Sequence, residues 1–271
     1  RMQIICFEDV DVDRLRPRTR ARPAHTITSA ITSASFRLID WLKRIPGKLS
    51  GHVRPYLQEI QRLDYDLYRC NPLNDGATDL LLVNARLAPT VGLDAQLLNW
   101  TKSASSSAVF DQEDQAVLLA FIRAADLAEL QAGQIQDVLD HATTLPQTPL
   151  ELDVFRWPHD VIEHRMKQMP AAMNWRLNHE EYTEKLDGVF VRGNVQIGNY
   201  PVVDVSDGPI LLNEGVQVGP FCYLSGPVFA GAGTRIIKHT ALKVGVSLGH
   251  TVNWWRSRGL DHRTLHQQTA S

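Results

Sequence analysis

Five arginines stand at alternate positions between residues 14 and 22, with no carboxylate among them. A guanidinium group keeps its charge throughout the physiological pH range and binds phosphate or carboxylate through two parallel hydrogen bonds. Arg14, Arg16, Arg18, Arg20 and Arg22 could therefore form an anion-binding loop for phosphates. The same spacing also fits a hydrated surface, and the residue types leave both interpretations open.

Two apolar runs predict the strands that would position this loop. Residues 3–7 and 79–84 are typical of strands that are buried on both faces. Helical patterns follow at residues 36–43, 112–130, 134–141 and 159–177. Strands that alternate with helices predict an α/β domain with a largely parallel sheet.

Ligands of such sheets bind beyond the carboxyl ends of the strands. Two segments directly follow the predicted strands, Glu8 to Arg22 and Asn84 to Arg86. We therefore expect these two segments to lie at one edge of the sheet and to form the binding site.

A period of six residues governs the C-terminal third of the chain. One column is aliphatic throughout and contains Leu212, Val218, Leu224, Ala230, Ile236, Leu242 and Leu248. The column four residues later is small or β-branched and contains Val216, Cys222, Val228, Thr234, Thr240, Val246 and Val252. Glycines such as Gly198 and Gly219 follow the first column, where tight corners favour them. This pattern predicts a left-handed parallel β-helix of hexapeptide repeats, whereas an antiparallel sandwich would alternate with a period of two.

The change of pattern predicts an α/β domain over residues 1–185 and the β-helix over residues 186–252, with a loop near residues 204–209 that shifts the register by three. Residues 253–271 are polar and off register, and we expect them to be a disordered tail or a cap. Codons for Asn253, Trp254 and Trp255 read one base later can give an aliphatic residue and glycines. We therefore favour the hypothesis that a frameshift has truncated the repeat.

Composition excludes some classes of function. The chain has 28 Lys plus Arg against 30 Asp plus Glu, so it lacks the positive field of a protein that binds a nucleic acid polymer. No run approaches the roughly 18 apolar residues of a membrane span. The three cysteines are scattered and form no CxxC motif, which predicts a soluble protein in a reducing cytoplasm.

Several landmarks together resemble sugar nucleotidyltransferases that are similar to the bifunctional UDP-N-acetylglucosamine pyrophosphorylase/glucosamine-1-phosphate N-acetyltransferase. The landmarks are residues 2–9, residues 15–24 with Arg22-Pro23, residues 36–41, residues 82–87, residues 157–162 and the repeat up to Leu248-Gly249-His250-Thr251-Val252. The resemblance covers residues 1–252. It implies a Rossmann-like nucleotidyltransferase domain followed by the left-handed β-helix.

The resemblance also implies a reaction in which a sugar 1-phosphate attacks the α-phosphate of a nucleoside triphosphate, with UTP and N-acetylglucosamine 1-phosphate as expected substrates and Mg²⁺ as expected cofactor. It implies these site residues: Arg22 and Arg16 as catalytic, Glu8, Arg14, Asn84 and Arg86 at the nucleotide and its phosphates, and Trp157 and Asp160 at the sugar substrate. The metal ligands remain unassigned. Two structural alternatives stay open, a turn closed by Asn84 and a first-turn acid at Asp160 that the helix dipole favours.

Other features point away from this reaction. Residues 8–23 contain no glycine, although the familiar pyrophosphorylases have a glycine-rich phosphate loop there. A hexapeptide-repeat acyltransferase is one alternative, but His239 and His250 are candidate bases by residue type alone, and acetyl-CoA is not expected to bind the truncated coil. A degenerate, non-catalytic trimerisation module is another. The repeat architecture also predicts a homotrimer.

Overall fold

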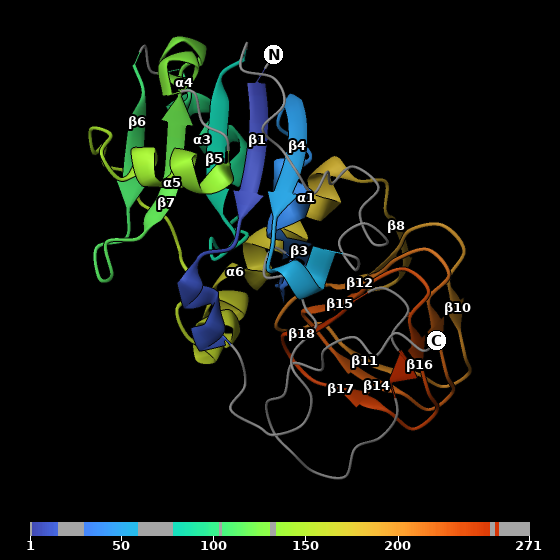
Figure 1. The fold of residues 1–271 in the computed structure, drawn as a ribbon. Helices are drawn as coiled ribbons and strands as arrows, with labels where there is room; N and C mark the ends of the chain where they lie inside the picture. Colours follow the sequence, from blue (N-terminus) through green and yellow to red (C-terminus); the bar gives the residue numbers. More distant parts are fainter. Residues whose placement is uncertain are drawn as a thin grey trace. The chain divides into compact units, whose positions relative to one another are not determined.

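The computed structural model describes residues 2–15, 30–58, 78–102, 105–130, 134–249 and 253–254. Contacts divide the chain into two compact units, which Figure 1 shows in sequence colours. Unit 1 contains Arg1–Ile31 and Arg37–Val161, and unit 2 contains Thr32–Phe36 and Ile162–Ser271. The chain thus divides by contacts after Val161, whereas its sequence pattern changes near residue 185.

Unit 1 contains a five-stranded sheet with the order β4-β1-β5-β7-β6. The strands are β1 (Met2–Phe7), β4 (Gly47–His52), β5 (Leu80–Asn84), β6 (Ser107–Phe110) and β7 (Val117–Ile122). β1 pairs in parallel with β4 and with β5, while β7 is antiparallel to both β5 and β6. The two strands predicted from the apolar runs are confirmed, and the sheet is mixed, with β7 running opposite to its neighbours.

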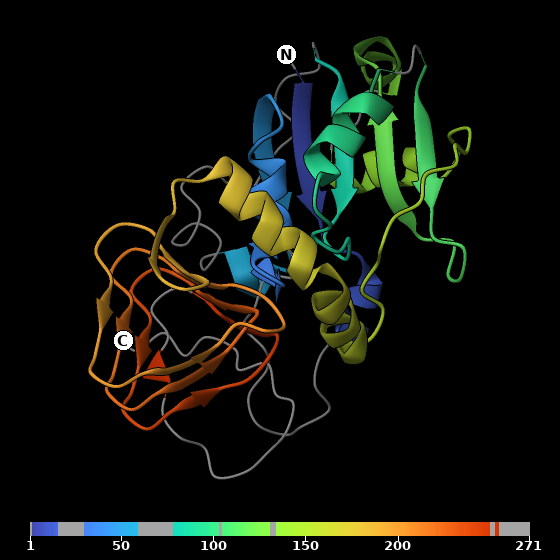
Figure 2. The ribbon, with the colours of Figure 1, turned by 180° about the vertical axis from the view of Figure 1, so that it is seen from behind.

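Helices cover both faces of this sheet, as the opposite views in Figures 1 and 2 show. They are α1 (Leu38–Leu42), α3 (Leu93–Trp100), α4 (Ala124–Leu130) and α5 (Ile135–Ala142). Two short 3-10 helices, η1 (Val10–Leu15) and η3 (Pro55–Leu57), follow β1 and β4. Val138 and Ala142 of α5 join the core formed by Leu80, Leu82 and Ala120. A short hairpin, β2 (Thr32–Ser33) and β3 (Phe36–Arg37), precedes α1.

One predicted element is wrong. Residues 112–130 are not one amphipathic helix but contain β7 and α4, separated by Arg123. All six residues of β7, Val-Leu-Leu-Ala-Phe-Ile, are buried. A strand that is covered on both faces has no polar side, so its sequence cannot be told from a buried helix by periodicity alone.

Unit 2 contains three parallel sheets of short strands that lie beside one another in successive turns of the chain (Figures 1 and 2). The first sheet contains β10 (Gln196–Ile197), β13 (Gln217–Val218), β16 (Arg235–Ile236) and β19 (Asn253–Trp254). The second contains β11 (Val202–Asp204), β14 (Tyr223–Ser225) and β17 (Ala241–Leu242). The third contains β9 (Val189–Val191), β12 (Ile210–Leu212), β15 (Val228–Ala230) and β18 (Val246–Leu248), with β8 (Thr183–Leu186) antiparallel at its edge. We call residues 189–254 the coil region.

The register of the coil region follows the sequence period. Leu212 pairs with Ala230 and Ala230 with Leu248, which is a return every 18 residues. The first turn takes 21 residues, from Val191 to Leu212, so the three-residue shift near residues 204–209 is confirmed. Pairing continues past Val252, because Trp254 pairs with Ile236, while residues 255–271 lie outside the described residues. This arrangement is compatible with a β-helix.

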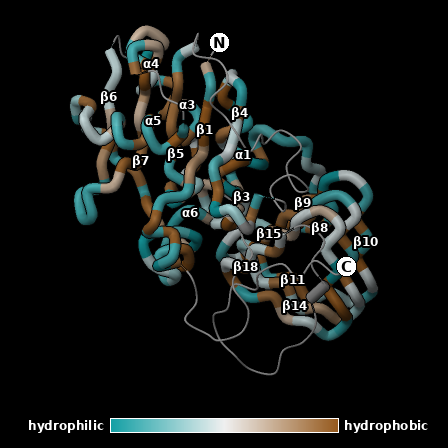
Figure 3. Tube along the Cα trace, viewed as in Figure 1, coloured by the Kyte–Doolittle hydropathy of each residue, from teal (hydrophilic) through white to brown (hydrophobic). Residues whose placement is uncertain are grey.

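The two predicted columns form the core of the coil region. The first column, from Leu212 to Leu248, is buried at every position. In the second column Val216, Cys222, Val228, Thr234 and Thr240 are buried as well. Figure 3 shows the hydrophobic residues along these strands and along the central strands of unit 1. The hexapeptide pattern therefore records which side chains point into the coil.

Glycines at the corners have a different role from the one expected. Gly198 and Gly219 do not have the positive φ that favours glycine. A Cβ at Gly198 would lie 2.7 Å from the backbone nitrogen of Pro220, and one at Gly219 would lie 2.5 Å from that of Lys238. Glycine is needed here because the backbone of the next turn approaches too closely for any side chain.

Helix α6 (Pro158–His179) leads into the coil region, and Arg176 fixes its last turns within unit 2. The Arg176 guanidinium lies between two aromatic rings, 4.2 Å from the centroid of Phe36 and 4.5 Å from that of Phe229. It donates hydrogen bonds to the hydroxyl and carbonyl oxygens of Ser35 and pairs with Glu180. Hydrogen bonds and two cation–π contacts thus hold a buried charge. No helix in the described ranges is long and apolar enough to span a bilayer.

We predict that Arg176→Met lowers the free energy of unfolding by about 2–3 kcal/mol, because it removes a buried, hydrogen-bonded cation from two rings. Chemical denaturation followed by circular dichroism measures this loss. Arg192→Met is the control: Arg192 also pairs with Glu180 but is half exposed, and its loss should cost less than about 1 kcal/mol. Equal effects of the two substitutions would contradict the assignment.

Candidate functional site

The carboxyl ends of β1, β4 and β5 meet at one edge of the sheet in unit 1. The chain passes from β1 to β4 on one side and then to β5 on the other, so a topological switch point lies between β1 and β5. Open α/β sheets bind ligands outside the strand ends at such a point. Glu8 and Asp9 follow β1, Arg54 follows β4, and Arg86 follows β5.

Arg86 is the centre of this edge, and its side chain is fully buried. Its Nε and Nη2 donate to Oδ2 of Asp9 at 3.0 and 2.8 Å. Asn84 donates from Nδ2 to the same Asp9 oxygen at 2.7 Å and to the Val117 carbonyl at 2.9 Å, and its Oδ1 accepts from the backbone N–H of Arg86. These bonds tie the ends of β1 and β5 and the start of β7 together. Asn84 thus closes the turn after β5, which was the structural alternative for this residue.

The charges around Arg86 compensate its burial. Burial alone would lower the pKa of the Arg86 guanidinium, but the carboxylates of Asp9, Asp114 and Asp11 outweigh it and raise that pKa. A buried cation is tolerated when it is paired and hydrogen-bonded in this way. Arg86 is therefore a fixed positive charge behind the site.

Arg14 is the cation that the edge presents to solvent. It lies on η1, its side chain is 43% exposed, and it pairs with Asp11 at 2.9 Å and with Asp114 at 3.6 Å. Its guanidinium carbon lies 6.0 Å from the ring centroid of Trp157, which is itself exposed. Arg14 and Trp157 were predicted from distant parts of the sequence, and the fold brings them together. The result is a cation on a long, flexible side chain beside a flat aromatic ring.

Glu8 faces the β4 side of the edge. Its buried carboxylate accepts from Nε of Arg54 at 2.9 Å and from the Arg54 backbone N–H at 3.2 Å. His52, the last residue of β4, is half buried, and burial lowers the pKa of its imidazole although the charge of Glu8 opposes this. Glu8 therefore anchors the segment after β4, and its negative charge would repel a phosphate rather than bind it.

A second ion pair, between Arg156 and Asp111, lies next to the start of α6. Arg156 donates to both carboxylate oxygens of Asp111, at 2.8 and 3.1 Å. Burial would raise the pKa of Asp111, but the hydrogen bonds from Arg156 and from the Glu113 backbone lower it. Asp160 accepts from the backbone N–H groups of Arg156 and Trp157, at 2.7 and 2.8 Å. It therefore stabilises the helix start, as the structural alternative for Asp160 expects.

The sequence missed several members of this network. Arg54, Asp111, Asp114 and Arg156 are part of it, and no motif in the sequence marked them, whereas Asp9 lay within the predicted segment but was assigned no role. Asp9 is the second residue after the first predicted strand, and this position was the signal that could have given it a role. Arg16 and Arg22, the predicted catalytic residues, lie outside the described residues, so their role stays a prediction.

The ion-paired residues at this edge have a net negative charge. The carboxylates are Glu8, Asp9, Asp11, Asp13, Asp111, Glu113 and Asp114, and the arginines are Arg14, Arg54, Arg86 and Arg156. Seven carboxylates and four arginines leave three negative charges unbalanced. A triphosphate would be repelled unless further cations approach.

The described carboxylates do not fit a dedicated Mg²⁺ site. No group of three or more His, Cys, Asp or Glu side chains among the described residues is arranged to hold a metal ion. The carboxylates that could serve are already paired with arginines, as Asp9 is with Arg86 and Asp11 with Arg14. Mg²⁺ in proteins is often held by one or two carboxylates together with substrate phosphates. The described residues alone therefore supply no metal-dependent step.

Comparison with known families identifies one match. The sequence model of a family described as sugar nucleotidyl transferase matches residues 4–178, which is more than half of the chain. The match begins within β1, covers the other four strands of the unit 1 sheet in full and ends within α6. Among the curated proteins, none matches this sequence.

We predict that Asp9→Ala lowers the free energy of unfolding by about 3–5 kcal/mol, because it leaves Arg86 buried without its main counter-charge. Chemical denaturation measures the loss. Asp13→Ala is the matched control, since this exposed carboxylate lies 3.4 Å from Arg54 and should contribute less than about 1 kcal/mol. A loss at Asp9 no larger than that at Asp13 would refute the central role of the pair.

We predict that the contribution of Asp111 to stability depends on pH. Because its folded pKa is lowered, the contribution is fully present above the unfolded pKa of about 4 and is lost as the pH falls through the folded pKa. The difference in unfolding free energy between wild type and Asp111→Asn should therefore be constant above about pH 5 and shrink at lower pH. Denaturation curves across this range measure it, and a difference that grows on acidification would contradict the prediction.

Proposed function

This chain belongs to the sugar nucleotidyl transferase family, and we propose that it joins a nucleoside triphosphate to a sugar 1-phosphate. A phosphate oxygen of the sugar 1-phosphate forms the new bond to the α-phosphorus while the bond to the leaving pyrophosphate breaks. The products are a nucleotide-sugar and pyrophosphate. The observation that carries this proposal is the family match over the sheet whose switch point holds Arg14, Trp157 and the Arg86–Asp9 pair.

The chemistry requires positive charge more than it requires a nucleophile from the protein. The reacting groups are anionic, so the site must bring them together and offset the charge at the α-phosphate and on the leaving group. Arg14 can swing on its long stem toward a phosphate, and Trp157 offers a face on which a planar base can stack. Arg86 and Asn84 hold the strand ends in place, and neither is accessible to a ligand.

Charge balance supports a role for the arginines that follow Arg14. The described edge has three unbalanced negative charges, whereas residues 16–22 add Arg16, Arg18, Arg20 and Arg22 and no carboxylate. Together they would turn a surface that repels phosphate into one that attracts it. We therefore keep Arg22 and Arg16 as the proposed phosphate-contacting, catalytic residues.

The proposal also specifies the two substrates. We assign UTP and N-acetylglucosamine 1-phosphate as the pair, with Mg²⁺ bound through the triphosphate, where it would neutralise charge. We also assign the coil region to a left-handed β-helix. The homotrimer predicted from the repeat stays a prediction, and the proposal does not extend to acetyl transfer.

We predict that pyrophosphate is released when the protein is given a nucleoside triphosphate, a sugar 1-phosphate and Mg²⁺. A coupled assay over a panel of bases and sugars measures the release, with the highest kcat/KM expected for UTP and N-acetylglucosamine 1-phosphate. No release with any pair would overturn the proposed function.

Within that assay, Arg22→Ala should lower kcat/KM by about 100-fold, the usual effect of removing one stabilising donor from a reacting phosphate. Arg22→Lys should restore part of the loss because it restores the charge. Arg44→Ala is the control: Arg44 is an exposed arginine paired with Asp94, away from the strand ends, and its removal should leave the rate unchanged. Full activity in Arg22→Ala would show that the phosphates bind elsewhere.

A further inference from the structure

One corner of the coil region exposes a column of stacked rings. Tyr200, Phe221 and His239 occupy the same place in three successive turns, with ring centroids 5.4 Å apart at both steps and interplanar angles of 19° and 9°. Tyr200 is 73% exposed and Phe221 is 52% exposed. Because the rings cover each other's faces, they present their edges to solvent, which suits a protein surface better than a planar ligand.

The three aromatic residues at this corner have an unfavourable backbone conformation. Tyr200, Phe221 and His239 have φ values of 58°, 56° and 60°, in the left-handed region that glycine adopts without cost. A bulky residue pays a steric penalty there, and such strain is concentrated at functional positions. Three aromatic residues in three successive strained corners therefore indicate that the rings themselves are needed.

The sheet that follows this corner is also apolar outside. Val202, Tyr223 and Ala241 pair in register across β11, β14 and β17, and Val202 is 58% and Tyr223 39% exposed. Among the described residues, nine large hydrophobic side chains are exposed, and four of them are Tyr200, Val202, Phe221 and Tyr223. We call the two columns together the aromatic face. An exposed apolar patch of this kind marks an interaction surface.

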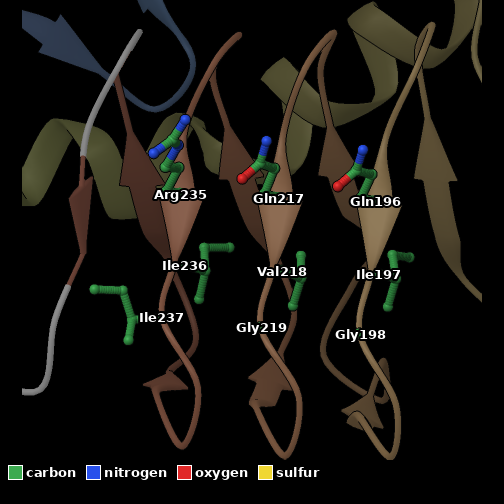
Figure 4. Close-up of a pocket in the computed structure, with 9 residues that line it drawn as sticks. All are labelled: Gln196, Ile197, Gly198, Gln217, Val218, Gly219, Arg235, Ile236 and Ile237. Atoms are coloured by element: carbon green, nitrogen blue, oxygen red, sulfur yellow. The ribbon is translucent and has the colours of Figure 1, made fainter.

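The sheet on the other side of the corner has polar side chains at matching positions of its successive strands, and the apolar Ile197 and Ile237 lie beside them. Figure 4 shows Gln196, Gln217 and Arg235 side by side in successive turns of β10, β13 and β16, beside a shallow pocket that also includes Gly198 and Gly219. The aromatic face therefore has a polar border, as protein interfaces do.

The distribution of charge along the coil region indicates what kind of surface would fit against the aromatic face. Asp204 ends β11 in the first turn, and Lys243 follows β17 two turns later on the same sheet. More widely, residues 189–214 contain Asp204, Asp207 and Glu214 against one cation, Arg192, whereas residues 234–249 contain Arg235, Lys238 and Lys243 and no carboxylate. The coil region is thus acidic at the beginning of the aromatic face and basic at its end.

We propose that the aromatic face binds a second copy of this chain, with the two coil regions antiparallel about a twofold axis. The axis lies in the interface and crosses the coils at the level of Phe221. It places Phe221 against Phe221 of the second copy once, on the axis. Tyr200 then lies opposite His239 and Asp204 opposite Lys243, and each of these two contacts occurs twice. Parallel packing, including the homotrimer expected from the repeat, would instead bring the basic third turns together. The twofold arrangement proposed here therefore replaces that expectation.

The first test is the mass of the full-length protein in solution. Sedimentation equilibrium of the wild type should give twice the chain mass of 30.4 kDa. Phe221→Asp should raise the dimer dissociation constant by about 100-fold or more, because it buries two facing carboxylates at the axis. Asp tolerates the left-handed backbone at this position, so the fold should be kept, which circular dichroism verifies.

Leu186→Asp is the matched control, since Leu186 is a similarly exposed large hydrophobic residue of unit 2 outside the aromatic face, and it should leave the mass unchanged. A second pair of substitutions tests the orientation. Asp204→Lys and Lys243→Asp should each weaken the dimer, and the double variant should restore it, because the twofold axis pairs the two positions. A wild-type monomer, a trimer, or a double variant weaker than both single ones would overturn the proposal.

Discussion

The pairing of one buried cation with one carboxylate holds the switch point of unit 1 in place. Arg86 follows β5 and Asp9 follows β1, and these strands are neighbours in the sheet, so their ends are joined by a charge pair. Neither group could be buried alone without a cost of several kcal/mol. The pair therefore makes the conformation of both loops interdependent, and η1, which presents Arg14, begins one residue after Asp9.

This constraint separates two kinds of residue at the site. Arg86, Asn84 and Glu8 are committed to partners within the protein and set the positions of the strand ends. Arg14 and Trp157 lie on the solvent side and remain accessible. A ligand at this edge would consequently contact the accessible side chains of Arg14 and Trp157, which lie over the fixed ion pairs of the strand ends. The ion-paired residues at the strand ends include more carboxylates than arginines, which explains why a phosphate-binding function would need the arginines beyond Arg14.

The sequence predicts the architecture better than it predicts the site. Strong periodicity revealed the columns of the coil region and the strands β1 and β5, because those side chains face one core. It failed at β7, whose fully buried sequence has no polar side, and at β4, where Gly-Lys-Leu-Ser-Gly-His has little apolar character. The site depends on pairs such as Arg156 with Asp111, 45 residues apart, and no local pattern indicates which acid an arginine will meet.

In the coil region, the sequence repeat predicts which residues form columns on the surface as well as in the core. The first turn returns to the same corner after 21 residues and the later turns after 18, so residues far apart in sequence form straight columns on the surface. Inside, a column must be aliphatic, and at Gly198 and Gly219 the neighbouring backbone leaves no room for a side chain. On the outer surface of the coil region, packing does not require any particular type of side chain. An outward column that keeps aromatic rings at three successive positive-φ corners departs from what the backbone prefers, and a strain repeated at every turn has to be offset by something the rings contact.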